Sequence, residues 1–317
     1  MATTTAAAFT PDMSKPVEIK EMEKVQAMDL KRTSRILFNF SLVTVFLLIF
    51  CFLILPDSAE GNGTRAASAE SSSGKEQSIL EQSRAVTSWG RIVYGKSGLG
   101  ANLVCYQICP EGPIKRNILM TFEVHGYEDL FPGDGKALVN MGNSVADYFI
   151  KNRGQLQNCR LFLVASANPE GLSHGKSKDG IGRCQASLGV NINRDFDFNF
   201  IVFNESRDHT LSAPFAAPES RALRNLVNAV RPDIVIDCHG WENHFIGDHW
   251  LAGFFRDSLG ISRINSFDQS QHGYFSAWAG SKGIQSMLIE YPTNAARNSG
   301  LYAGKTITGI RRLVGSL

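Results

Sequence analysis

From about residue 79 onward, the chain carries two kinds of apolar pattern. Short apolar runs bounded by glycine, proline or polar residues predict strands. They fall at 91–94, 103–109, 117–124, 160–165, 234–237 and 286–290. Apolar residues at helical spacing predict helices at 136–151, 218–230, 275–283 and 302–313. Strands that alternate with helices favour an α/β fold with a mixed, largely parallel central β-sheet flanked by helices.

The pattern is different nearer the N-terminus. Residues 36–55 are mostly apolar and carry no charge. As a helix, a segment of that length matches the hydrocarbon thickness of a bilayer. The alternative is a cleaved signal peptide, but the preceding region is long and no A-x-A site follows. We therefore predict one uncleaved transmembrane helix.

The charges around this segment predict its orientation. Lys31, Arg32 and Arg35 lie immediately before it, so the N-terminus is expected in the cytoplasm. The rest of the chain would then be extracellular or lumenal. The predicted organisation is a cytoplasmic tail at 1–35, a membrane anchor at 36–55, a Ser/Ala/Gly/Glu-rich linker at 56–78 and a folded domain at 79–317.

Composition narrows the classes of function. The 317 residues have a net charge of +2, and no Lys/Arg block stands out in the folded part, which argues against nucleic acid as a partner. None of the six cysteines forms a C-x-x-C pair, which argues against a cysteine zinc site. One or two disulfides are compatible with the sequence, but it does not define their pairing.

Candidate chemistry begins at the end of the apolar run 118–124. His125 and Glu128 lie three positions apart where that strand should end. An imidazole nitrogen and a carboxylate oxygen at this spacing can reach one cation, and zinc accepts both. The pair alone is more often a strand-end histidine beside a solvated acidic loop, so further residues are needed to support a metal site.

A third ligand candidate has the same setting. His239 follows the apolar run 234–236 and precedes a glycine. Ligands of open α/β sheets bind at the carboxyl ends of the strands, so two such histidines can converge. Asp237 could orient a ligand as a hydrogen-bond acceptor, and His244 is the best substitute should His239 not be a ligand.

Four further polar residues are candidates for a role in the site. Arg183 lies in a glycine-rich loop, and Asn193 stands beside Arg194, a pairing of donors that suits a carboxylate. Glu290 ends the last predicted strand. Burial there would raise its pKa and suit it to act as a base.

The ordered set resembles the zinc carboxypeptidase family typified by the pancreatic carboxypeptidases, over about residues 90–317. The set is His125-x-x-Glu128, Asn168-Pro169-Glu170-Gly171, Arg183, Asn193-Arg194, His239 and Glu290. The order and the strand-end positions agree, and together they are far more specific than any one motif.

The resemblance implies a role for each residue. One zinc ion per chain would be bound by His125, Glu128 and His239. Glu290 would be the general base for the zinc-bound water and then the acid toward the leaving amine. The family's remaining roles, stabilising the oxyanion and holding the terminal carboxylate of a peptide or protein, would fall to Arg183 and to Asn193 with Arg194, respectively.

The chain also departs from the family pattern. The mobile tyrosine of the family aligns near Gln269, and Tyr274 falls instead in the expected specificity-pocket segment, so no tyrosine role is assigned. The interval between Arg183 and Asn193 is short, as in trimmed bacterial-type members. No activation propeptide is recognised before the domain, and we expect no zymogen stage.

The expected function is a membrane-anchored zinc metallocarboxypeptidase acting outside the cytoplasm. Tyr274 and Phe275 weakly favour an apolar or aromatic substrate side chain, and cell-wall stem peptides are an equally open substrate. A zinc-dependent amidohydrolase acting on N-acyl amino acids is the first alternative. A non-catalytic peptide-binding relative is the second.

Overall fold

The structure is a computed structural model, and it describes residues 72–317. The predicted tail at 1–35, the predicted transmembrane helix at 36–55 and the first part of the predicted linker lie outside the described residues. Within residues 72–317, no helix combines the length and apolar character needed to cross a membrane.

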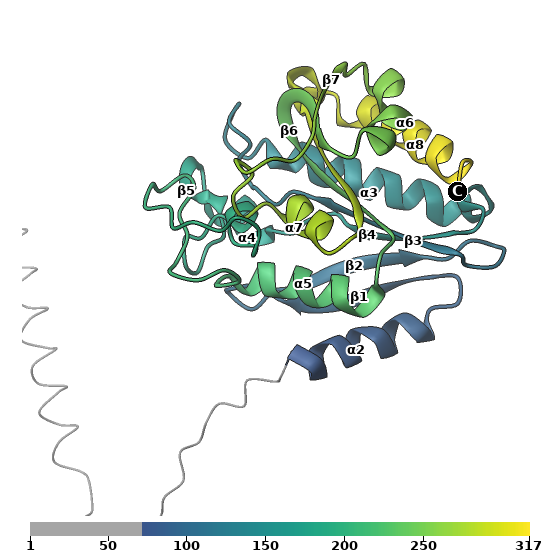
Figure 1. The fold of residues 1–317 in the computed structure, drawn as a ribbon, viewed down its shortest axis with the longest axis horizontal. Helices are drawn as coiled ribbons and strands as arrows, with labels where there is room; N and C mark the ends of the chain where they lie inside the picture. Colours follow the sequence, from purple (N-terminus) through teal and green to yellow (C-terminus); the bar gives the residue numbers. More distant parts are fainter. Residues whose placement is uncertain (1–71) are drawn as a thin grey trace, which may run out of the picture. The chain divides into compact units, whose positions relative to one another are not determined.

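A seven-stranded mixed sheet forms the centre of the domain (Figure 1). Its order is β1-β2-β4-β3-β6-β7, and β8 also pairs with β6. The β1–β2 and β2–β4 pairs are antiparallel, whereas β4, β3 and β6 run parallel. The strands are β1 (Trp89–Lys96), β2 (Asn102–Ile108), β3 (Arg116–Phe122), β4 (Cys159–Val164), β6 (Ile234–Gly247), β7 (Arg263–Asn265) and β8 (Gln285–Pro292). The predicted α/β class with a mixed, largely parallel sheet is confirmed.

Helices cover both faces of this sheet (Figure 1). In β4, Leu161 and Leu163 belong to one apolar core, while Phe162 and Val164 belong to the other. A strand buried on both faces needs apolar residues at successive positions, which explains the continuous apolar runs. The first core lies under α3 (Gly135–Lys151), α6 (His249–Leu259) and α8 (Ser299–Val314), and the second under α2 (Ser72–Ala85), α5 (Pro218–Val230) and α7 (Phe275–Ser281).

Short elements complete the fold. They are α4 (Pro169–His174), β5 (Ser177–Cys184) and the 3-10 helices η1 (Arg153–Leu156), η2 (Ile192–Arg194) and η3 (Thr293–Arg297). The described cysteines, at positions 105, 109, 159, 184 and 238, are buried and free.

Strand β6 is much longer than the predicted 234–237 and has two arms. Residues 234–240 pair in ascending order with 285–291 of β8. Residues 244–247 then pair in descending order with 290–287 of the same strand. Because a strand has only two pairing edges, the two arms of β6 lie on either side of β8. Between the arms lie Glu242 and Asn243, and the second arm itself has only Phe245 and Ile246 as apolar residues, too short a run to predict a strand.

The predicted linker at 56–78 extends too far, because α2 begins at Ser72. This helix is mostly polar and buries only Ile79 and Ser83, which explains its weak periodic signal. The Gln82 side chain accepts a bond from Val93 N (3.0 Å) and donates to Val93 O (3.2 Å), so it binds the outer edge of β1. The folded domain therefore begins before residue 79.

Candidate functional site

The loop that carries His125 and Glu128 begins where β3 ends at Phe122. Gly126 lets this loop pack against its neighbours. A Cβ at position 126 would lie 2.4 Å from Leu172 N in α4 and 2.6 Å from Gly182 O in β5. Glycine is required here because those contacts are with backbone atoms, which cannot move aside as a side chain can.

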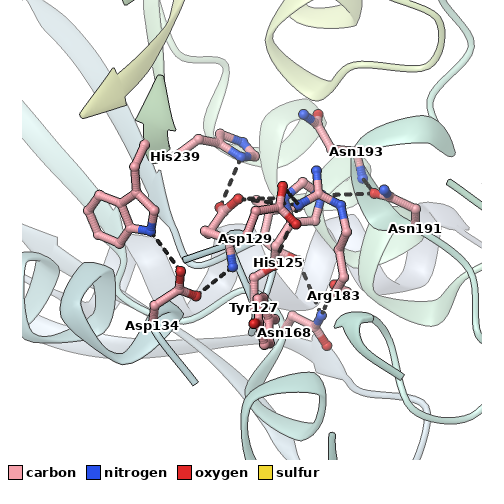
Figure 2. Close-up of polar contacts among 12 residues, drawn as sticks. His125, Tyr127, Asp129, Asp134, Asn168, Arg183, Asn191, Asn193 and His239 are labelled. Atoms are coloured by element: carbon pink, nitrogen blue, oxygen red, sulfur yellow. Dashed lines mark hydrogen bonds and ion pairs between the residues drawn. The ribbon is translucent and has the colours of Figure 1, made fainter. Parts of the chain in front are cut away.

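The structure brings the three predicted ligands together. Nδ1 of His125 lies 3.0 Å from Oε2 of Glu128, and Nδ1 of His239 lies 3.3 Å from Oε1 of the same carboxylate. One ligand atom from each residue lies within 4.8 Å of the others. All three side chains are at most 2 % exposed. Figure 2 shows His125 and His239 converging from two different strand ends.

In each imidazole, the ring nitrogen that does not face Glu128 contacts a side-chain oxygen that holds the ring in place. Nε2 of His125 lies 2.9 Å from Oδ1 of Asn191, and Nε2 of His239 lies 2.9 Å from Oδ2 of Asp237. Thr121 Oγ1 in turn donates to Asp237 Oδ1 over 2.6 Å. Acceptors at both Nε2 atoms leave both Nδ1 atoms facing the carboxylate. This is the outer-layer arrangement that orients histidine ligands toward a metal.

The residues present fit a zinc ion. Two imidazole nitrogens and a carboxylate oxygen are the three-ligand donor set of a catalytic zinc site. Oε1 of Glu128 is buried and has no partner of hydrogen-bond geometry among the described residues. A cation between the three side chains would satisfy that oxygen.

The burial of His125, Glu128 and His239 and their contacts with one another shift the pKa values of all three groups. Burial lowers the pKa of His125 to about 4. Burial opposes ionisation of Glu128, but the His125 and His239 imidazoles hold its pKa well below the usual range. Burial also opposes protonation of His239, yet the Asp237 and Glu128 carboxylates raise its pKa well above the usual value. The site thus favours an ionised carboxylate facing a cation.

Asp134 connects the loop to the second histidine strand (Figure 2). Its carboxylate accepts from the backbone nitrogens of Glu128 and Leu130 and from Nε1 of Trp241 over 2.5, 2.9 and 2.9 Å. Asp134 was missed in the sequence, where it reads only as a residue before a predicted helix. It fixes the Glu128 backbone relative to the segment that follows His239.

Glu290 lies next to this cluster on β8, in register with His239. Its Oε2 atom is buried and has no hydrogen-bond partner among the described residues. Burial raises the pKa of Glu290 to about 8, although the His239 imidazole acts in the opposite direction. A carboxylate that is neither bridged nor hydrogen-bonded at one oxygen is available to exchange a proton.

Each of the predicted arginines pairs with a carboxylate. Nη1 of Arg183 lies 3.7 Å from Oε2 of Glu128 and 3.2 Å from Oδ2 of Asp129. Oδ1 of Asn193 accepts from the backbone of Phe275 over 2.9 Å, so its amide nitrogen is the group left for a ligand. Arg194 lies 4.7 Å from the Tyr274 ring centroid and pairs with Asp208 through Nη2 over 3.1 Å.

Several residues of this outer layer could not be inferred from the sequence. Asn191 is two positions before Asn193, and that proximity was the only signal for it. The sequence contains no signal for Asp129, Arg207 or Asp208, because the residues that they contact are distant in the sequence. His244, the substitute ligand candidate, is buried near Glu242 and is not part of the cluster.

Comparison with known proteins assigns the family. The profile of the zinc carboxypeptidase family matches residues 91–250, which is half of the chain. The chain therefore belongs to the zinc carboxypeptidase family, whose cofactor is zinc, and it carries a candidate site for that ion.

Individual relatives agree with this assignment. The chain is 33 % identical over 239 residues to bacteriocin BCN5 of Clostridium perfringens, covering 73 % of this chain and 26 % of that protein. It thus spans about a quarter of the length of the curated relative it matches.

Solved structures share the fold. Thrombin activatable fibrinolysis inhibitor matches with a TM-score of 0.59 at 16 % identity, over 78 % of this chain and 76 % of that one. The murein-tripeptide amidase MpaA of Escherichia coli O157 matches with a TM-score of 0.53 at 21 % identity, over 73 % of this chain and 95 % of that one.

Proposed function

We propose that this protein is a membrane-anchored zinc metallocarboxypeptidase that hydrolyses C-terminal peptide bonds outside the cytoplasm. One observation carries the peptidase assignment. Nη2 of Arg194 pairs with Oδ1 of Asp208 (3.1 Å), Asn191 donates to the same oxygen (3.1 Å), and Asn191 accepts from His125 (2.9 Å). A cation suited to a carboxylate is thereby fixed relative to the metal centre, as a C-terminal exopeptidase requires.

The residues divide the reaction between them. Zinc, when held by His125, Glu128 and His239, supplies a Lewis acid that polarises the scissile carbonyl and favours deprotonation of water. Glu290 accepts the proton at its unpartnered oxygen and returns it to the leaving amine. Arg183, whose Nη1 lies 3.7 Å from Oε2 of Glu128, would stabilise negative charge that develops on the carbonyl oxygen.

The test is a digest of a peptide library by the full-length protein in detergent, with zinc content measured in parallel. We expect sequential release of C-terminal residues and one zinc per chain. Release should stop when a chelator is added or when Glu290 is replaced by glutamine. Undiminished release from the Glu290→Gln protein would refute the mechanism.

A second candidate function is hydrolysis of amide bonds in cell-wall stem peptides. Two relatives support it, one described as a murein-tripeptide amidase and the other as a bacteriocin. Incubation with stem tripeptides and with linear peptides that end in apolar residues separates the two functions. An N-acyl amino acid as third substrate tests the amidohydrolase alternative.

The membrane anchor is proposed from the sequence of residues 36–55 alone. Lys31, Arg32 and Arg35 support a cytoplasmic N-terminus and an extracellular or lumenal catalytic domain. Protease treatment of sealed membranes of known orientation tests this topology. Digestion of the C-terminal domain from the cytoplasmic side would refute it.

A further inference from the structure

One loop, at residues 203–210, contacts Arg194 directly and Arg183 through Asp129. Its ends are joined by Phe203 N, which donates to Thr210 Oγ1 over 2.9 Å, and by Thr210 N, which donates to Phe203 O over 3.1 Å. Asn191 also binds the loop. Its backbone nitrogen donates to His209 O (2.8 Å), and its side-chain nitrogen donates to Arg207 O (3.1 Å). These bonds fix the loop relative to the metal centre.

Asp208 in this loop contacts the carboxylate-binding arginine. Its Oδ1 accepts both Nη2 of Arg194 and Nδ2 of Asn191, each over 3.1 Å. Arg194 is only 13 % exposed, so its guanidinium has little water to orient it or to balance its charge. The Phe203 and Tyr274 rings lie 5.9 and 4.7 Å from the same guanidinium. Together with Asn193 O, which accepts from Nη1 of Arg194 over 3.0 Å, Asp208 therefore determines where Arg194 presents its remaining donors.

The preceding residue, Arg207, acts on the other arginine. It forms a two-pronged ion pair with Asp129, whose Oδ2 also lies 3.2 Å from Nη1 of Arg183. Asp129 adopts a left-handed backbone conformation with φ of 81°, which is unfavourable for a residue with a side chain. The contact with Arg207 fixes this carboxylate, and the carboxylate in turn fixes Arg183.

We propose that Arg207 and Asp208 are positioning residues with separate roles, Asp208 for binding of the substrate carboxylate and Arg207 for the chemical step. The proposal rests on the proposed function, because it uses the roles given there to Arg194 and Arg183. Arg194 would contact a carboxylate equally before and during reaction, so its misplacement raises KM. Arg183 would act on charge that exists only in the transition state, so its misplacement lowers kcat.

Adjacent substitutions in one loop provide the test. For Asp208→Ala we expect KM to rise about tenfold with kcat nearly unchanged. Asp208→Asn should recover most of that loss, because an amide oxygen can accept both bonds. For Arg207→Ala we expect kcat to fall about tenfold with KM nearly unchanged, and Arg207→Lys, which lacks the planar fork, should recover only part of it. Glu205→Gln is the matched control, because it removes one charge from the same loop without a side-chain role in the site.

A binding measurement separates this proposal from the proposed function. Calorimetric titration of the zinc-loaded protein with 3-phenylpropanoate, which has a carboxylate and an aromatic ring but no amide bond to hydrolyse, reports carboxylate binding without turnover. Asp208→Ala should weaken that binding about tenfold, whereas Arg207→Ala should leave it nearly as in the wild type. A wild-type protein that binds zinc and this ligand but hydrolyses no peptide would refute the proposed function. The role of Asp208 in carboxylate binding could still be tested with that protein.

Two results would overturn the proposal. One is that Asp208→Ala binds 3-phenylpropanoate as tightly as the wild type. The other is that Asp208→Ala and Arg207→Ala lower kcat and raise KM to the same extent with parallel losses of melting temperature. The second result would mean that the loop merely supports the fold.

Discussion

Glu128 and Glu290 are two carboxylates at the same edge of the sheet with opposite surroundings. Both oxygens of Glu128 face imidazole nitrogens, and its backbone is held by Asp134. Glu290 has a buried oxygen without a hydrogen-bond partner among the described residues. The pKa of Glu128 is accordingly held below its usual range, whereas burial raises that of Glu290 to about 8.

The difference shows how one residue type serves two purposes. A ligand must be ionised and immobile before the metal arrives, and Glu128 meets both conditions. A base must bind and release a proton near the working pH, and Glu290 meets that condition because its buried oxygen has no hydrogen-bond partner among the described residues. The surroundings, rather than the carboxylate itself, therefore distinguish a ligand from a base.

The largest expected effect is on metal binding. Replacing Glu128 with alanine should weaken zinc binding by more than about 100-fold and abolish activity, because two ligands remain. Zinc measured after dialysis should fall from one per chain to nearly none. The exposed neighbour Glu242→Gln should keep its zinc. If the Glu128→Ala protein kept one zinc per chain, Glu128 would not be a ligand, and the contrast between Glu128 as ligand and Glu290 as base would fail.

The second prediction concerns Glu290 as the base. Glu290→Gln should lower kcat by about 10²–10⁴-fold, the contribution typical of a positioned base, while zinc content stays at one per chain. Steady-state kinetics measure the loss of kcat, and metal analysis of the same sample measures the zinc content. Loss of zinc together with activity would instead identify Glu290 as a ligand.

The third prediction tests the layer behind the ligands. Asp237→Asn should weaken zinc binding by about 10–100-fold, because the Nε2 of His239 loses a charged acceptor. Competition with a chromophoric chelator measures the change. Thr121→Val, which removes only the hydroxyl that bonds Asp237, should have a smaller effect in the same direction. An Asp237→Asn protein with unchanged affinity would show that the histidine needs no such support.

The smallest expected effect is on the pH dependence of stability in the metal-free protein. The pKa of Glu290 rises from 4.5 in the unfolded chain to about 8 in the fold, so the folded state binds the extra proton. Its contribution to the free energy of unfolding is complete below pH 4.5 and is lost as the pH rises to 8. Denaturant titrations should show a wild-type stability that falls more steeply than that of Glu290→Gln across this interval.

Zinc provides the control for that measurement. A bound cation favours the ionised carboxylate, so zinc should reduce the difference between wild type and Glu290→Gln. Equal slopes for the two metal-free proteins would mean that Glu290 is not protonated in the fold, and the contrast with Glu128 would be weaker.

Positions at strand ends were predictable from the sequence. His125, His239 and Glu290 each terminate an apolar run, and the carboxyl ends of parallel strands share one edge of a sheet. The α/β class follows from the same runs, because strands buried on both faces must be continuously apolar. The transmembrane helix at 36–55 stays a prediction, since it lies outside the described residues.

The tertiary structure decided what surrounds those positions. Asp134 meets Trp241, and Arg207 meets Asp129, across sequence separations that no local pattern encodes. Such contacts depend on how loops return to the sheet and on the reversal of β6 around β8, and both follow from packing rather than from periodicity. The sequence alone thus determined which groups could carry the chemistry. The fold determined how each is charged, held and oriented, because those properties depend on neighbours that only folding brings together.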